Sequence, residues 1–302
     1  MAPDSGRCSA ISTQRTETLA GTAPVARRWV LIEHPGPWAK QPLDTAPLAG
    51  GFRQRLEEAM ARRGAKALLM RHTGRYVETA EPLLWRVIDV VTGMAVSGTW
   101  TRERDLDAVI AALDAVAGSL AMPAPEMVLV CTHGTRDACC AIKGRPIVGT
   151  LSRAFDDVWE CSHLAGHRFA GTALVFPEGA CYGRLEQADA VRIVRDHRDG
   201  RVDAGRLRGL TALEPAAQAA HVWGLAQVAR ERPEAPLAVG DVEIGAVAVG
   251  PEGRTTVEVY GARTDDAPVT VTVESRPLPP APLSCGQAPE EAVSHVVVAP
   301  PA

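Results

Sequence analysis

The sequence predicts an α/β (α+β) chain made of two similar units followed by a small β-rich region. Short apolar runs with strand character alternate with stretches of helical periodicity from residue 28 onward. The order strand, helix, strand, strand, strand, helix occurs twice before residue 200. Beyond residue 200, one helical stretch precedes strands separated by turn residues, which is typical of an antiparallel sheet.

The first unit follows a polar lead-in at residues 1–25. Its expected elements are a strand at 28–33, a helix at 52–63, strands at 67–71, 85–91 and 94–100, and a helix at 104–120. Thr92 and Gly93 separate two of these strands and indicate a hairpin. Apolar residues at helical spacing in 104–120 indicate a helix that packs one face against a sheet.

The second unit repeats this order. Its expected elements are strands at 127–130, 158–161, 172–176 and 180–185, and helices at 146–155 and 187–196. Because the halves share element order but little sequence identity, we hypothesise an internal duplication of a thioredoxin-like unit. The remaining elements are a helix at 214–230, strands at 242–249, 255–260 and 269–273, and a partly extended tail rich in Pro and Ala. We therefore expect domains at 1–122, 123–200 and 201–302.

Composition argues against several classes of function. The net charge is −4 and the chain has no stripe of basic residues, so we expect no nucleic-acid binding. It has no apolar run of about 18 residues, so we expect no membrane span. Residues 1–18 lack an apolar signal core, which predicts a cytoplasmic protein. The basic residues are almost all Arg, which indicates a GC-rich bacterial genome.

Seven cysteines give the first indication of chemistry, because five of them fall between residues 131 and 181. An odd number with uneven spacing does not indicate a disulfide framework. In a reducing compartment, clustered thiols are expected to be metal ligands or reactive groups. Cys181 and Cys285 are expected to be small buried apolar residues, and Cys8 lies in the polar lead-in.

Two segments carry the candidate ligands. Cys131 ends an expected strand and eight residues separate it from Cys140, so the intervening loop can wrap one metal ion and return at the start of a helix. His163 and His167 are separated by three residues that include Gly166, so their imidazoles can converge on a second ion. Thiolates suit iron with sulfide, and imidazole suits iron or zinc.

These segments resemble the sucrase/ferredoxin-like family. The matching pieces are Cys131 and Cys140, Gly144-Arg145-Pro146, Val158-Trp159-Glu160, His163 and His167 running into Arg168-Phe169-Ala170, Leu174-Val175-Phe176-Pro177, Tyr182-Gly183-Arg184, Gly21-Thr22-Ala23 and the stretch from Glu33 to Trp38. The resemblance implies a thioredoxin-like ferredoxin. Fungal members hold a [2Fe–2S] cluster with two cysteines and two histidines, which by position implies Cys131, Cys140, His163 and His167 as ligands. No convincing pair of glycosidase carboxylates supports the word sucrase.

Several alternatives remain open for the ligand set. Cys139 and Cys161 are alternative ligands, and a site with three cysteines would have a lower reduction potential. The Cys-x-His pairs at 131 and 161 resemble Rieske pairs, but their spacing is wrong for that fold. Arg168 is a candidate neighbour of the cluster that would raise its potential. A zinc-stabilised interaction module would use the same donors, whereas a thioredoxin-like thiol redox protein would need a Cys-x-x-Cys pair that the sequence lacks.

The expected function is therefore one-electron transfer by a ferredoxin-like carrier rather than catalysis. Solvent-facing histidine ligands would couple electron transfer to proton uptake, so that the potential falls as pH rises. The sequence has no phosphate-binding loop and no dinucleotide fingerprint. A separate reductase must then supply the electrons, and neither this donor nor the acceptor is specified by the sequence.

Overall fold

The computed structural model describes residues 6–74, 82–116, 118, 121–233, 235–262 and 267–298. The chain divides into two compact units. The central unit comprises residues 26–165 and 171–179, and the terminal unit comprises 1–25, 166–170 and 180–302. None of the described helices is long and apolar enough to cross a membrane. The expected domain boundaries at 122 and 200 stay a prediction.

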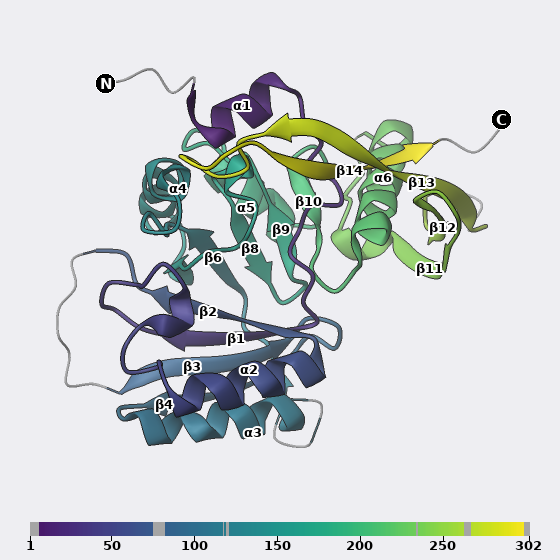
Figure 1. Ribbon diagram of the computed structural model, residues 1–302. Coiled ribbons are helices and arrows are strands. Elements are labelled where there is room, and N and C mark those ends of the chain that lie inside the picture. The colour runs from purple at the N-terminus through teal and green to yellow at the C-terminus, as the bar shows by residue number, and fades with distance from the viewer. Residues whose placement is uncertain are drawn as a thin grey trace. The chain divides into compact units, whose positions relative to one another are not determined.

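Strands of a mixed sheet form the core of the central unit (Figure 1). In spatial order they are β8 (Ala173–Phe176), β6 (Met127–Cys131), β7 (Val158–Cys161), β2 (Ala65–Arg71), β1 (Arg28–Glu33), β3 (Leu83–Asp89), β4 (Met94–Trp100) and β5 (Met122–Pro123). The pairs β1–β2 and β6–β7 are parallel, and the other pairs in this series are antiparallel. The predicted α/β class is therefore confirmed.

Helices cover this sheet because their apolar stripes need a partner surface. They are α2 (Gly51–Arg63), α3 (Asp107–Ala115) and α4 (Ala138–Leu151), with short 3₁₀ turns η2 (Pro42–Asp44) and η3 (Glu103–Leu106). The helices α2 and α3 lie side by side against the strands β1 to β4 (Figure 1). Phe52 and Leu56 from α2 and Leu113 from α3 are fully buried in one core with Val30 of β1. Gly64 ends α2 in the left-handed conformation that favours glycine.

The terminal unit contains a second, smaller sheet. Its four strands β11 (Glu243–Val249), β12 (Arg254–Tyr260), β13 (Val269–Ala281) and β14 (Glu290–Val298) are all antiparallel, which confirms the expected antiparallel sheet. The helix α6 (Pro215–Glu231) contacts this sheet. The other elements of the unit are α1 (Cys8–Gln14), η4 (His167–Phe169), β9 (Ala180–Tyr182), α5 (Ala190–Arg198), β10 (Leu207–Leu210) and η5 (Val239–Asp241).

The predicted helix at 146–155 was placed too late. The helix α4 begins at Ala138, because the side chain of Asp137 accepts a hydrogen bond from the N–H of Cys139 at 2.8 Å and caps the first turn. Pro146, the first residue of the expected helix, lies inside α4. Cys140 consequently lies in the first turn of a helix, as the ligand spacing predicts.

Three other expectations need correction. The lead-in contains the helix α1, and the tail forms the second half of β13 and all of β14. The tail forms strands because β13 and β14 satisfy each other's backbone hydrogen-bonding groups, despite the prolines in β13. The helix expected at 104–120 is divided into η3 and α3, which ends at Ala115, and positions 117, 119 and 120 lie outside the described residues.

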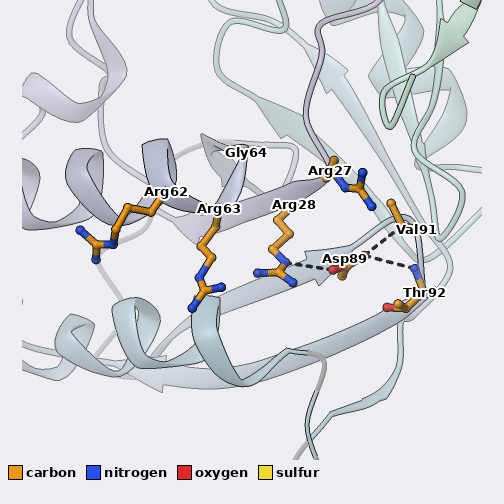
Figure 2. Close-up of a pocket in the computed structure, with 8 residues that line it drawn as sticks. All are labelled: Arg27, Arg28, Arg62, Arg63, Gly64, Asp89, Val91 and Thr92. Carbon is orange, nitrogen blue, oxygen red and sulfur yellow. Dashed lines mark hydrogen bonds and ion pairs between the residues drawn. The ribbon is translucent and has the colours of Figure 1, made fainter. Parts of the chain in front are cut away.

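A buried carboxylate fixes the turn between β3 and β4. Asp89 accepts hydrogen bonds from the guanidinium of Arg28 at 2.9 Å and from the N–H groups of Val91 and Thr92. It lies in a pocket of about 470 Å³ that four arginines also line (Figure 2). Burial raises the pKa of Asp89, but these hydrogen bonds and the charge of Arg28 together outweigh burial and hold the pKa below its usual value.

Replacing Asp89 by asparagine is expected to lower the free energy of unfolding by about 1–3 kcal/mol at neutral pH. Because the folded pKa lies below the unfolded value of about 3.9, the stabilisation is present above that value and is lost as pH falls through the folded pKa. Urea unfolding from pH 7 to pH 3 measures the loss. The exposed Asp114, which pairs with Arg63 at 2.7 Å, is the matched control, and Asp114→Asn should change stability by less than about 1 kcal/mol. Equal effects of the two substitutions would contradict the prediction.

Candidate metal centre

Two cysteines and one histidine meet at an end of the central unit's sheet. Cys131 is the last residue of β6, Cys140 lies in the first turn of α4, and His163 follows β7 by two residues. The two sulfur atoms and a ring nitrogen of His163 all lie within 4.8 Å of one another. Both thiols are 1% exposed, whereas His163 is half-buried. The site is thus a buried sulfur pair with an imidazole on its more open side.

The parallel pairing of β6 and β7 creates this meeting point. In their register Cys131 lies beside Cys161, so both strands end at the same edge of the sheet. The chain leaves β6, turns, and starts α4 at the Asp137 cap, which returns Cys140 toward Cys131. The arginine-lined pocket lies at the other end of β2, because Ala65 pairs with Arg28 whereas Met70 pairs with Cys161.

The two thiols are electrostatically unequal. The Cys140 thiol donates a hydrogen bond to the sulfur of Cys131, and this bond is the main cause that holds the pKa of Cys131 well below its usual range. His163 and the N–H of His133 act in the same direction, while burial opposes them. The same hydrogen bond, burial and the Cys131 thiolate raise the pKa of Cys140. The environment therefore favours the thiolate form at Cys131 over Cys140, and a thiolate is the form that binds metals.

The other predicted site residues are not part of this group of three donors among the described residues. His167 and Arg168 belong to η4 of the terminal unit, where Arg168 donates to Glu17 at 2.9 Å. The sulfur of Cys139 lies within 4.8 Å of a carboxylate oxygen of Asp137. Cys161 is fully buried and is outside the group of three donors among the described residues. The set of four ligands Cys131, Cys140, His163 and His167 stays a prediction.

A partly buried ion pair beside the cysteines was missed by the sequence reasoning. Glu160 in β7 accepts from Arg71 of β2 at 2.8 Å and from the hydroxyl of Thr132 at 2.8 Å. Thr132 directly follows Cys131, so this network fixes the backbone at the end of β6. Glu160 was noted in the sequence within Val158-Trp159-Glu160, one of the segments that resemble the family. Its role could not be predicted from that, because it depends on the antiparallel pairing of Arg71 with Glu160.

The loop after β1 packs an aromatic side chain, Trp38, beside this network. Trp38 packs edge-on against the ring of His133, with centroids 5.7 Å apart, and the guanidinium of Arg71 lies 4.3 Å from the Trp38 ring. The indole N–H of Trp38 donates to the carbonyl of His34 at 3.0 Å. Burial lowers the pKa of His133, which favours its neutral form. The stretch from Glu33 to Trp38, noted in the sequence for its resemblance, thus contacts residues that flank Cys131.

The donor set fits a metal ion or an iron–sulfur cluster. A tetrahedral metal with sulfur bonds of about 2.3 Å places two thiolates about 3.8 Å apart. The sulfurs of Cys131 and Cys140 lie within 4.8 Å of each other, so only a small shift is needed. Two thiols with an imidazole are donors that suit iron or zinc rather than hard cations such as magnesium.

Fold and site together define a mixed α/β protein with a buried cysteine–histidine group that could hold a metal. The chain belongs to the sucrase/ferredoxin-like family, because the sequence model of that family matches residues 19–209. It is also similar to a protein of Meyerozyma guilliermondii called altered inheritance of mitochondria protein 32, with 36% identity over 84 residues. That match covers 23% of this chain and spans 28% of the length of the Meyerozyma protein. No solved structure matches the chain.

Proposed function

We propose that this chain binds a [2Fe–2S] cluster through Cys131, Cys140, His163 and His167 and carries single electrons as a ferredoxin-like protein. The observation that carries the proposal is the convergence of two buried thiols and one imidazole within 4.8 Å at the end of β6. Membership of the sucrase/ferredoxin-like family supports the choice of a cluster over a single ion. His167 is proposed from the family resemblance as the fourth ligand.

Each residue has a defined task in this proposal. A bound cluster would supply a one-electron couple, and the protein would hold and tune it. Cys131 and Cys140 would supply sulfur ligands in a dry environment, and His163 would supply an imidazole nitrogen on the half-buried side. Arg71, Glu160 and Thr132 keep the end of β6 in place. Proton coupling through the histidines stays a prediction that the dependence of the potential on pH would test.

The partners are proposed from what the sequence lacks. With no dinucleotide or phosphate-loop motif in the sequence, a separate reductase would donate electrons to the cluster and a second protein would accept them. We propose that the chain works in the cytoplasm, a reducing compartment in which clustered thiols are expected to serve as metal ligands or reactive groups rather than structural disulfides. The printed name of the Meyerozyma protein refers to mitochondria, which makes that compartment the alternative to test by localisation of a tagged chain.

The visible absorption spectrum of anaerobically purified protein, with iron and sulfide assays on the same sample, tests the proposal. A red-brown protein with about two irons and two sulfides per chain is the expected result. A colourless protein that contains about one zinc per chain would assign the same donors to a structural zinc site and would refute electron transfer.

We also propose that the sheet arose by duplication of a thioredoxin-like unit. The pairing in which β1 is parallel to β2 and antiparallel to β3 recurs where β6 is parallel to β7 and antiparallel to β8. The helices α2 and α4 each connect the parallel pair of their half. Superposing residues 28–89 on residues 127–176 tests the idea, and strand directions that fail to coincide would reject it.

A further inference from the structure

A second pair of thiols lies in the terminal unit, outside the proposed ligand set. Cys8 is the first residue of α1 and is 1% exposed, and Cys285 is a half-buried residue of the loop between β13 and β14. Their sulfur atoms are 3.6 Å apart although the two residues are 277 positions apart in the chain. The structure has no disulfide between them.

We propose that Cys8 and Cys285 are a redox-sensitive modification site that forms a reversible disulfide. A disulfide needs sulfurs about 2.05 Å apart, so the two sulfurs must approach by about 1.5 Å. Gly286 follows with a φ of +76°, and a Cβ atom there would meet no atom within 4 Å, so the backbone next to Cys285 is open on that side. A local adjustment of this loop can therefore close the bond.

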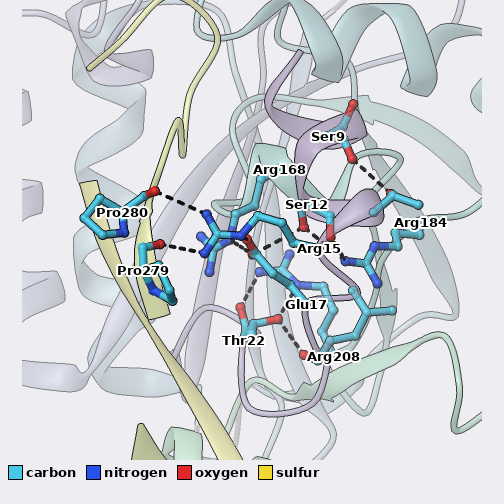
Figure 3. A network of polar contacts seen from close by, with 12 residues as sticks. Ser9, Ser12, Arg15, Glu17, Thr22, Arg168, Arg184, Arg208, Pro279 and Pro280 are labelled. Carbon is cyan, nitrogen blue, oxygen red and sulfur yellow. Dashed lines mark hydrogen bonds and ion pairs between the residues drawn. The ribbon is translucent and has the colours of Figure 1, made fainter. Parts of the chain in front are cut away.

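Contacts independent of the sulfurs hold the two segments together. The guanidinium of Arg15, which directly follows α1, donates to the carbonyls of Pro279 at 2.6 Å and Pro280 at 3.3 Å in β13 (Figure 3). One end of α1 is thus attached to β13 by hydrogen bonds, while the other end presents Cys8 to the following loop. The short distance between the sulfurs is a consequence of how α1 packs on this hairpin.

The reaction is a thiol–disulfide exchange with a small-molecule disulfide such as glutathione disulfide. The thiolate of Cys285, the more exposed residue, attacks one sulfur of the oxidant, forms a mixed disulfide and releases one glutathione thiol. The thiolate of Cys8 then attacks the Cys285 sulfur, forms the Cys8–Cys285 bond and releases the second glutathione thiol. Two electrons and two protons pass from the protein to the oxidant. Reversible disulfides of this kind are the ones found in reducing compartments.

The position of α1 gives the disulfide a consequence that rests on the proposed function. The helix α1 contacts η4, which begins with His167. Glu17, shortly after α1, accepts from Arg168 at 2.9 Å and from Ser12 at 3.3 Å (Figure 3). A disulfide at Cys8 would restrict the opening of α1 and, through this ion pair, the movement of the segment that carries His167. Oxidation would then slow the loss of a bound cluster.

The disulfide is tested on the full chain without iron, so that the result does not depend on the cluster. The chain is equilibrated in glutathione buffers of increasing disulfide content, its remaining thiols are alkylated, and non-reduced peptides are identified by mass spectrometry. The expected result is one dominant cross-linked peptide that contains Cys8 and Cys285 and that dithiothreitol removes. Cys8→Ser and Cys285→Ser should each abolish it. Cys181→Ser, which removes another buried thiol of the same unit, should leave it unchanged.

Three outcomes would overturn the proposal. They are the absence of the cross-linked peptide at all buffer ratios, equal yields of cross-links to other cysteines, and a zinc ion held by the wild-type chain but lost in both serine variants.

The consequence for the cluster has its own readout, which is iron release to a chelator from the loaded protein. Release should be roughly tenfold slower in the oxidised form, and an unchanged rate would refute the coupling. A chain that never binds iron would refute the proposed function but would leave the cross-link result intact.

Discussion

Replacing Cys131 by serine is expected to lower the iron bound by the anaerobically purified chain to less than about a tenth of the wild-type content. The Cys140 thiol and His163 hold the pKa of Cys131 well below its usual range, which favours the thiolate form that binds a metal. A serine hydroxyl cannot supply a soft anionic donor at that place. Cys140→Ser should give the same loss, since both sulfurs lie within 4.8 Å of each other.

Cys161→Ser is the matched control for these two variants. Cys161 lies beside Cys131 in the register of β6 and β7 and is fully buried, yet it is outside the group of three donors among the described residues. Its substitution should leave the iron content near the wild-type value. Iron loss in Cys161→Ser with retention in His167→Ala would replace the proposed ligand set by three cysteines and one histidine. Circular dichroism of each apo variant separates ligand loss from unfolding.

His163→Cys tests the same site by changing the reduction potential of the bound cluster rather than by removing a ligand. A thiolate in place of a neutral imidazole adds negative charge to the site, so the bound cluster should be harder to reduce. The variant should retain iron and show a lower reduction potential than the wild-type chain in a redox titration.

The sequence predicts those features that depend on a short stretch of chain. The strands β1 and β7 have the predicted bounds, because each is a short apolar run with a clear end. The spacing after Cys131 predicts Cys140 at the start of a helix, and Cys140 lies in the first turn of α4, although the helix itself was expected later, at 146–155. The role of Glu160 could not be predicted, because it depends on the pairing of β2 with β7, which are separated by more than 80 residues. The tail shows the same limit. Its prolines argue against a strand in the sequence, and the strand forms because β13 and β14 pair with each other.

Gly144→Ala is expected to lower the free energy of unfolding by about 1–3 kcal/mol, although alanine favours helix formation by about 1 kcal/mol. A Cβ atom at Gly144 of α4 would lie 2.1 Å from the carbonyl oxygen of Cys131 and 3.3 Å from the methyl group of Thr132. The first distance is far too short for any contact, and the obstacle is backbone at the end of β6. The helix α4 must therefore move away from β6, and the steric cost exceeds the gain in helix propensity.

The same movement should disturb the candidate metal centre, because Cys140 lies one turn before Gly144 on the same helix face. Gly144→Ala should then reduce bound iron several-fold in addition to its effect on stability. Gly149→Ala is the control, since a Cβ atom at Gly149 of α4 would meet no atom within 4 Å. It should raise the free energy of unfolding by about 0.4–1 kcal/mol and leave the iron content unchanged. Urea unfolding of the two apo variants and iron assays of the two loaded variants measure these effects. Equal stability of the two alanine variants would show that α4 does not need its close approach to Cys131.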